Sequence, residues 1–486
     1  MRRANMLKIL TAAVSLLALA ACAVGPDYRP PATPATAAAP FVSTSAATSV
    51  AAPDDHWWRL YDDAVLDGLV TQALAANTDL RVAVARLARA RASLREVRTD
   101  RTPQATLGAG ASYNRFSQVQ RPAGVAGETW VIDGGLDLSY EVDLFGRISR
   151  NVAAARGDVA AADADADAVR VAVVADTTRA YADAAAAAER IAVAERIVAL
   201  LDRQVRTTER RVDVGMTTPL DTARIAALRD QRSADIPLLQ AERQAALFRL
   251  ATLTGRTPQE LPAIAAQRTA TLRLTQPIPI GDGATLLARR PDVRAAERRL
   301  AAATARIGVA TADLYPRITL GGSIGQTSTG LGNLFGAGPL NFLLGPLLNW
   351  SVNRDRARAR IAGAEADTQA ALATFDGTIL TALGETETAL SNYARALDRR
   401  TALQRALDQA DRASRITRAQ RREGQIDSLS QLDAERTLAD AQAALAAQDA
   451  AIATAQIDLF RALGGRWERA GTARADLRRG DAGGRS

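Results

Sequence analysis

The side chains that most often carry enzyme chemistry are scarce in this chain of 486 residues. It has one cysteine, Cys22, and one histidine, His56, which precedes a tryptophan pair. A cysteine–histidine pair, a Ser-His-Asp triad or a histidine-containing zinc site needs several such partners placed together. We therefore expect no catalytic residue, no cofactor and no metal site, and an enzyme is the least favoured class of protein.

Two other patterns could suggest chemistry. Asp163, Asp165 and Asp167 alternate with alanines, but on a helix such carboxylates more often form a solvated face. The glycines of residues 321–325 lack the lysine and the following helix that a phosphate-binding loop requires. We expect neither an acid–base pair nor a nucleotide site here.

The charge pattern argues against nucleic acid as a partner. The formal net charge is +8, but arginines alternate with acidic residues, as in residues 206–213, which is typical of a mixed solvated face. No basic block interleaved with aromatic side chains is found in the sequence.

The N-terminus predicts export and lipid attachment. Basic residues precede an apolar stretch from Leu7 to Ala21 that is too short to span a membrane and fits a signal peptide. The run Leu19-Ala20-Ala21-Cys22 resembles a bacterial lipobox, in which Cys22 becomes the acylated first residue. Several acyl chains anchor a protein stably, and no aspartate follows Cys22 to resemble an inner-membrane retention signal. The alternative is an ordinary signal peptide with a cysteine nearby.

The chain is an internal duplication. Asp79-Leu80-Arg81 recurs as Asp292-Val293-Arg294, and Pro103–Gly108 recurs as Pro316–Gly321, each 213 residues later. A nearly constant offset over such a span predicts two copies of one structural unit.

Each copy contains two segments that alternate apolar and polar residues, the pattern of a strand with one apolar face. The segments lie at 104–117, 130–143, 316–326 and 342–353. A soluble two-layer sheet and a membrane barrel both fit this alternation. Four strands would leave two open edges, which lipid does not tolerate, so a membrane barrel would need several chains.

Long helices follow each strand pair. Residues 147–212 contain no proline, and a helix of this length is on the order of 100 Å long. Small and apolar residues recur in heptads, which predicts left-handed coiled packing. Glycines at Gly215 and Gly424 suit the positive φ at a helix C-terminus, so each long helix should turn there into a hairpin.

Taken together, several segments make the chain resemble the outer-membrane factor (TolC-like) family, and within it the NodT-type efflux lipoproteins. They are Ala21–Tyr28, Trp57–Tyr61, Tyr140–Arg147, Arg289–Val293 and Leu314–Pro316. The resemblance implies a homotrimer, mostly helical, whose twelve-stranded outer-membrane β-barrel continues into a long periplasmic α-helical barrel. It also implies an exit duct of a tripartite multidrug pump, with a periplasmic adaptor protein, an RND-type inner-membrane pump and outer-membrane lipid as partners.

The resemblance assigns roles at the hairpin tips. The family motif at the second tip is approximated by residues 424–433. It implies that Leu429 lies in an apolar constriction and that Asp433 contributes to an acidic ring at an iris-like gate. The alternative is that Leu429 and Leu432 are helix-packing residues and that Asp433 is a solvated charge. The residues expected to contact the adaptor are Gly215, Met216, Thr217, Gly424, Gln425 and Ile426.

The predicted organisation follows from these patterns. It is a signal peptide at 1–21, a lipid-anchored tether at 22–55, a first repeat at 56–256 with its hairpin at 147–254, a connection at 257–281, a second repeat at 282–466 with its hairpin at 355–463, and a disordered tail at 467–486.

Two other functions remain open at this point. A duct of a type I protein-secretion or metal-efflux system would share the architecture. A periplasmic coiled-coil scaffold without a pore would explain the heptads but not the four alternating strands.

Overall fold

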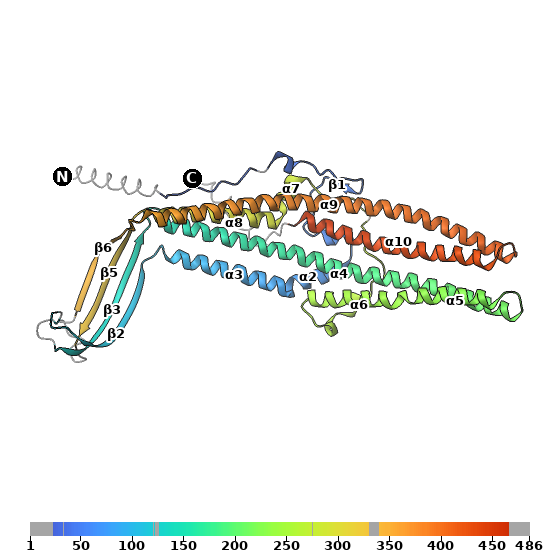
Figure 1. Ribbon diagram of the computed structural model, residues 1–486, viewed down its shortest axis with the longest axis horizontal. Helices are drawn as coiled ribbons and strands as arrows, with labels where there is room; N and C mark the ends of the chain where they lie inside the picture. The colour runs from blue at the N-terminus through green and yellow to red at the C-terminus, as the bar shows by residue number, and fades with distance from the viewer. Residues whose placement is uncertain are drawn as a thin grey trace, which may run out of the picture. The chain divides into compact units, whose positions relative to one another are not determined.

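The computed structural model describes residues 23–32, 34–119, 121, 126–274, 276–329 and 340–465, and most of them are helical (Figure 1). They form two compact units. Unit 1 takes the described residues of 1–32, 86–163 and 295–376, and unit 2 takes those of 33–85, 164–294 and 377–486. Each unit therefore combines segments from both halves of the chain.

Unit 1 contains an antiparallel sheet of four strands in the order β2-β3-β5-β6 (Figure 1). The strands are β2 (Gln104–Arg115), β3 (Glu128–Val142), β5 (Arg317–Ser328) and β6 (Leu340–Asn349). Their register places four apolar residues in one row across the sheet, namely Leu107, Leu136, Ile324 and Phe342. The neighbouring row on the opposite face holds Thr106, Asp137, Ser323 and Leu343. It is polar on β2, β3 and β5, as expected for side chains that alternate along a strand, but apolar on β6.

The apolar row is open to the surroundings of the single chain. Leu107 is 81% exposed and Phe342 is 80% exposed. Among the described residues, the strands at the two ends of the sheet, β2 and β6, each pair on one side only. Unit 1 therefore presents an uncovered apolar face and two unpaired strand edges.

The last strand ends earlier than the alternation predicts. β6 stops at Asn349, whereas the sequence pattern extends the strand to residue 353. Trp350 instead donates its indole N–H to the carbonyl of Leu314 at 3.1 Å. The side chain of Asn353 then accepts a hydrogen bond from the N–H of Asp355 at 3.2 Å, in the first turn of α9. Local hydrogen bonds that start a helix thus replace the last residues of the strand.

The helices of the chain include two of unusual length, α4 and α9. The α-helices are α2 (Ala64–Ala76), α3 (Thr78–Thr99), α4 (Arg147–Asp213), α5 (Pro219–Ser233), α6 (Asp235–Leu253), α7 (Gly283–Arg289), α8 (Pro291–Ala312), α9 (Arg354–Arg422) and α10 (Ser428–Leu463). Heptad positions of α4 such as Thr177, Ala184 and Leu201 are buried, in agreement with the predicted packing. None of the helices in the described ranges combines the length and apolar character that a membrane crossing requires.

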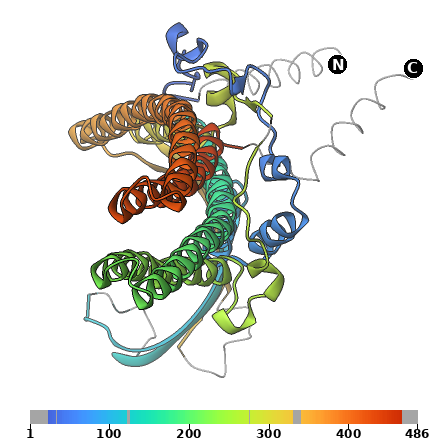
Figure 2. The same ribbon diagram turned by 90° about the vertical axis from the view of Figure 1, so that its right-hand side faces the viewer.

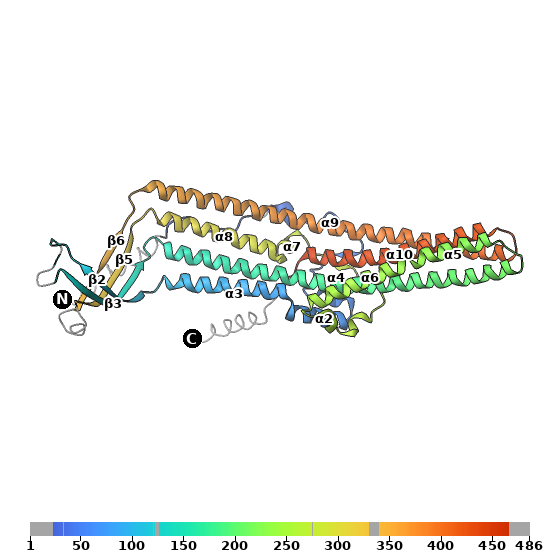
Figure 3. The same ribbon diagram turned by 60° about the horizontal axis from the view of Figure 1, so that its bottom comes forward.

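Unit 2 contains two helical hairpins, α4–α5 and α9–α10, which lie side by side (Figure 2) with their tips at the same end (Figures 1 and 3). The return arm of the first hairpin consists of two helices. α5 ends at Ser233 and α6 begins at Asp235. Pro237 explains the break, because a proline has no N–H and its ring clashes with the carbonyl four residues earlier. α10 has no proline and returns as one helix.

An aromatic cluster and short elements complete unit 2. Trp57 and Trp58, in the 3₁₀ helix η2 (Trp57–Tyr61), are buried, and Trp57 stacks on Phe460 with ring centroids 4.6 Å apart. Part of the predicted tether is held by strand pairing, because β1 (Thr48–Ser49) runs parallel to β4 (Ile278–Pro279). The remaining 3₁₀ helices are η1 (Ala35–Ala38), η3 (Pro258–Glu260) and η4 (Ala263–Ala266).

Candidate functional site

The two hairpin tips turn in the same way. At the first tip Gly215 has φ +73°, its N–H donates to the carbonyl of Val212, and the N–H of Met216 donates to the carbonyl of Arg211 at 2.7 Å. At the second tip Gly424 has φ +71°, and the two N–H groups of Gly424 and Gln425 make the equivalent bonds. These paired bonds form a Schellman cap, which needs a residue in the left-handed region and therefore favours glycine.

The helices that leave the tips begin differently. At the first tip the carboxylate of Asp221 accepts a hydrogen bond from the hydroxyl of Thr217 at 2.6 Å, and Pro219 opens α5. At the second tip Asp427 caps α10 by accepting from the N–H of Ser430 at 2.9 Å. The side chain of Arg421 also reaches across the second turn and donates to the carbonyl of Ile426 at 3.3 Å. The second tip thus has a side-chain clamp across its turn.

The six predicted contact residues at the tips are accessible. Gly215, Met216, Gly424 and Gln425 are exposed, and Thr217 and Ile426 are half-buried. Met216 is 75% exposed, and its neighbour Val214 is 66% exposed. Apolar side chains at this level of exposure are suited to contact another protein.

The two predicted gate residues lie on the exposed surface of α10. Leu429 is 51% exposed. Asp433 is exposed, and its side chain makes no ion pair with any residue that the structure describes. Leu432 instead packs against the apolar cluster of Ile197, Leu201, Leu228 and Ala439. Leu432 therefore packs within the chain, whereas the side chains of Leu429 and Asp433 are exposed on the surface of the single chain.

A strongly basic cleft lies between the two hairpins. The residues that line it are close in the sequence to the two tips. Its volume is about 540 Å³, and we call it the basic cleft. It is lined by Gln204, Thr207, Thr208, Arg211, Ile225, Arg415, Arg418, Arg421, Arg422, Ser428 and Gln431. Residues 206–213 were expected to form a solvated face, which is wrong for Arg211, because its side chain is half-buried in the cleft. The repeat of arginines every three residues at 415, 418 and 421 was the available signal.

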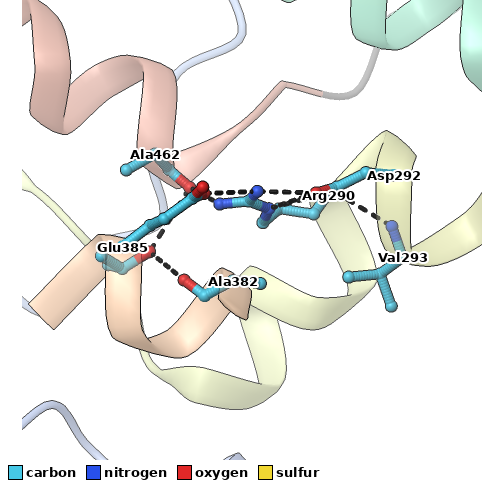
Figure 4. Close-up of polar contacts among 7 residues, drawn as sticks. Arg290, Asp292, Val293, Ala382, Glu385 and Ala462 are labelled. Atoms are coloured by element: carbon cyan, nitrogen blue, oxygen red, sulfur yellow. Dashed lines mark hydrogen bonds and ion pairs between the residues drawn. The ribbon is translucent and has the colours of Figure 1, made fainter. Parts of the chain in front are cut away.

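A second arginine site lies at the base of the second hairpin. The guanidinium of Arg290 sits between the carboxylates of Asp292 and Glu385 and the carbonyl of Ala462 (Figure 4). It donates to Asp292 at 2.6 Å, to Glu385 at 2.7 Å and to Ala462 at 3.1 Å. Burial would lower the pKa of Arg290, but the hydrogen bonds and charges of Asp292 and Glu385 raise it above its ordinary value. A permanently charged arginine therefore joins the α7–α8 corner to α9 and to the end of α10.

The acidic run on α4 is only partly solvated. Asp167 is buried, contrary to the expectation for residues 163–167. Its carboxylate accepts from Arg294 at 2.8 Å and also pairs with Arg170. A buried carboxylate needs such partners, so Asp167 has a structural role.

The predicted lipid attachment residue, Cys22, lies outside the described residues, but the segment after it is held firmly in unit 1. The N–H of Val24 donates to the carbonyl of Phe145 at 3.2 Å, and Arg150 donates to the carbonyls of Val24 and Gly25 and to the carboxylate of Asp27. Gly25 has φ +89° and leaves no room for a side chain, because an added Cβ would lie 2.5 Å from the Cα of Gly308.

The described residues contain no group of three His, Cys, Asp or Glu side chains that could hold a metal ion. The ring of His56 lies against Trp58, with centroids 5.1 Å apart. Within the described ranges, the charged clusters are therefore made of arginines and carboxylates.

Comparison with known proteins gives a consistent result. The sequence pattern described as "Outer membrane efflux protein" matches residues 69–256 and 284–465. The chain is 33% identical to outer membrane protein OprJ of Pseudomonas aeruginosa over 93% of its length and 94% of that protein. It is 29% identical to nodulation protein T of Rhizobium leguminosarum bv. viciae, over 90% of this chain and 89% of that one. Among solved structures it is similar to the outer-membrane channel OprN, with a TM-score of 0.85, 38% identity, and coverage of 92% of this chain and 100% of that one.

Proposed function

Because the chain belongs to the outer membrane efflux protein family, we propose that three copies form one exit duct across the outer membrane of a Gram-negative cell. Through it a tripartite system exports drugs or other small molecules that an inner-membrane pump and the periplasm deliver. The observation that carries the proposal is the sheet of unit 1, with its exposed apolar face and two unpaired edges.

A closed barrel explains this sheet. Unpaired backbone groups are too costly in lipid, so an open four-stranded sheet cannot remain there alone. Three copies would pair β2 of one chain with β6 of the next and give twelve strands, an even number within the range of such barrels. The row from Leu107 to Phe342 would face lipid, and the row of Thr106, Asp137, Ser323 and Leu343 would face a lumen that is polar except at β6. A periplasmic scaffold without a pore has no use for this apolar face.

The purified protein tests the duct directly. We expect detergent-solubilised particles with the mass of three chains and stepwise ion currents in planar bilayers. Phe342→Arg should reduce membrane assembly, because an arginine on the lipid face of a barrel costs about 2–4 kcal/mol near the bilayer midplane. Thr106→Arg, on the opposite face, is the matched control and should still assemble. A monomer without currents would contradict the proposal.

A lipid anchor at Cys22 agrees with the position of its neighbour. An added Cβ on Gly146 would lie 2.8 Å from the Cβ of Ala23, so the chain just after Cys22 meets the turn between β3 and α4. Acyl chains on Cys22 would then enter the leaflet near the end of the sheet. Radiolabelled palmitate should label the wild-type protein and not Cys22→Ser.

The hairpin tips are the proposed gate and adaptor site. We infer that Leu429 forms an apolar constriction and Asp433 an acidic ring where three copies of the second hairpin converge, and that helix movement opens them. The exposed tip residues around Met216 and Gln425 would contact a periplasmic adaptor, which connects the duct to an RND-type pump. The exposure of Leu429 and the unpaired carboxylate of Asp433 support this assignment.

A further inference from the structure

We propose that the basic cleft binds carboxylate side chains of the protein that docks on the hairpin tips. This inference rests on the proposed function, in which the tips contact an adaptor, and it adds the chemistry of that contact. The cleft contains five arginines, contributed by α4 and α9, and polar residues contributed by α4 and α10. Ile225 of α5 is the one apolar residue in its lining.

The positive charge of the basic cleft is only partly balanced. Arg418 binds the buried carboxylate of Glu435 with two hydrogen bonds of 2.5 and 2.7 Å, and Arg415 lies 3.0 Å from Asp411. Arg421 donates to uncharged oxygens only.

The side chains of Arg211 and Arg422 make no hydrogen bond or ion pair with any residue in the described part of the chain. Three of the five guanidinium groups therefore make no ion pair with a carboxylate among the described residues, although Arg421 lies near enough to Asp427 to lower the pKa of that carboxyl group. Like charges gathered in one cleft repel one another, so a bound anion lowers the electrostatic energy of the site.

Helix termini give a partial alternative explanation. Cations are favourable in the last turn of a helix, and Arg211 and Arg422 lie in the last turns of α4 and α9. The helix dipole does not require that basic residues converge, however. Arg210 is in the same last turn of α4 but is exposed and does not line the cleft. Arg415 and Arg418 lie before the last turn of α9 and still line the cleft.

The surroundings favour a protein segment over a free anion. A guanidinium group can bind a carboxylate through two parallel hydrogen bonds, and arginine is enriched at protein interfaces. Residues close to the cleft in the sequence expose large apolar side chains, namely Val214, Met216, Leu220, Ile416 and Leu429. A small anion would leave these apolar groups uncovered, whereas an acidic segment with apolar neighbours would cover both.

Peptide binding tests the inference on the full-length protein in detergent. The probe is a fluorescent hexaglutamate peptide, with hexaglutamine as the uncharged reference and inorganic phosphate as a small competitor. We expect hexaglutamate to bind and hexaglutamine not to bind. The double variant Arg211→Gln, Arg422→Gln should weaken hexaglutamate binding about tenfold or more, because it removes the two unpaired donors.

The matched control is Arg206→Gln, Arg412→Gln. It removes the same charge from the same two helices, at exposed positions that do not line the cleft. We expect its binding to stay within about twofold of wild type. Equal losses in the two double variants would overturn the proposal in favour of general attraction to a basic protein. Displacement of the peptide by equimolar phosphate would overturn it in favour of a small-anion site.

Bilayer currents separate this inference from the proposed function. Arg211→Gln, Arg422→Gln should conduct like wild type, because these residues are proposed to act in docking. Wild-type currents together with unchanged peptide binding in this variant would refute the carboxylate site and leave the duct intact. Specific peptide binding by a protein that never conducts would refute the duct and leave the carboxylate site intact.

Discussion

Arg290 and the arginines of the basic cleft belong to the same unit but have opposite electrostatic surroundings. All three nitrogens of the Arg290 guanidinium donate hydrogen bonds, and its side chain is only 10% exposed. Arg211 and Arg422 have no such partners within the described residues. Arginine therefore has two different roles in this unit. A buried arginine with all its partners joins helices, and an arginine without partners near an exposed tip is available to another molecule.

Of the variants considered, replacement of Arg290 should lower the free energy of unfolding the most. Arg290→Ala leaves Glu385 without a donor, whereas Asp292 keeps only the N–H of Val293 and the carbonyl of Ala462 keeps only the hydroxyl of Thr386. We therefore expect a loss of about 2–3 kcal/mol in the free energy of unfolding. The loss should fall short of that of a fully buried pair, because the side chain of Glu385 is 53% exposed. A lower melting temperature in circular dichroism checks this expectation.

Two further variants make the Arg290 test specific. Arg290→Lys keeps the charge but not the planar fork, so its melting temperature should lie between those of wild type and Arg290→Ala. Arg422→Ala should change the free energy of unfolding by no more than about 0.5 kcal/mol, because it removes an exposed side chain that has no partner among the described residues. If Arg422→Ala lowers the free energy of unfolding more than Arg290→Ala does, the structural role assigned to Arg290 is wrong.

Glu435 connects the two kinds of arginine site, because it is the buried partner of a cleft arginine. Glu435→Gln should lower the free energy of unfolding by about 1–2 kcal/mol, since it weakens two charged hydrogen bonds to Arg418. It should also leave the basic cleft more positive, and hexaglutamate should bind about two- to tenfold more tightly. Asp411→Asn, which acts on the more exposed Arg415, should change both quantities less. Weaker peptide binding in Glu435→Gln would contradict the electrostatic account.

The sequence predicted the elements well where one chain segment determines them. The alternation along residues 104–117 and 316–326 predicted β2 and β5 with ends within two residues of those observed, and glycines 215 and 424 marked both turns. Pro237 was a visible signal for the break between α5 and α6.

The arginine sites could not be predicted in the same way. Arg290 meets Glu385 and Ala462, which lie 95 and 172 residues away in the sequence. The basic cleft exists only because two hairpins are adjacent, and periodicity within one helix carries no information about its neighbour. The duplication, the trimer and the gate assignment remain predictions.

Asp433 offers a comparison between the two hairpins at the proposed gate. Three aspartates around a narrow pore would favour cations, so Asp433→Ala should lower the permeability ratio of K⁺ to Cl⁻ in planar bilayers. The expected change in the energy of a cation at the gate is on the order of 1 kcal/mol in a water-filled opening. Asp213→Ala is the control, because Asp213 is an exposed carboxylate at the end of α4 in the first hairpin. An equal change in both variants would mean that the second hairpin has no special role in selectivity.

The smallest expected effect concerns the acidic caps, which the two tips share. Hydrogen bonds from Thr217 and Thr218 lower the pKa of Asp221, and hydrogen bonds from Ser430 lower the pKa of Asp427. A carboxyl group whose pKa is lower in the folded state stabilises the fold above its unfolded pKa of about 3.9, and this contribution is lost as the pH falls through the folded value. Hydrogen exchange at the start of α5 and α10, corrected for intrinsic rates, should therefore accelerate below about pH 4. Asp221→Asn and Asp427→Asn should remove this acid-dependent part, each at its own tip only. If one tip keeps its protection in acid, the caps are not equivalent, and the difference between the hairpins begins at their turns.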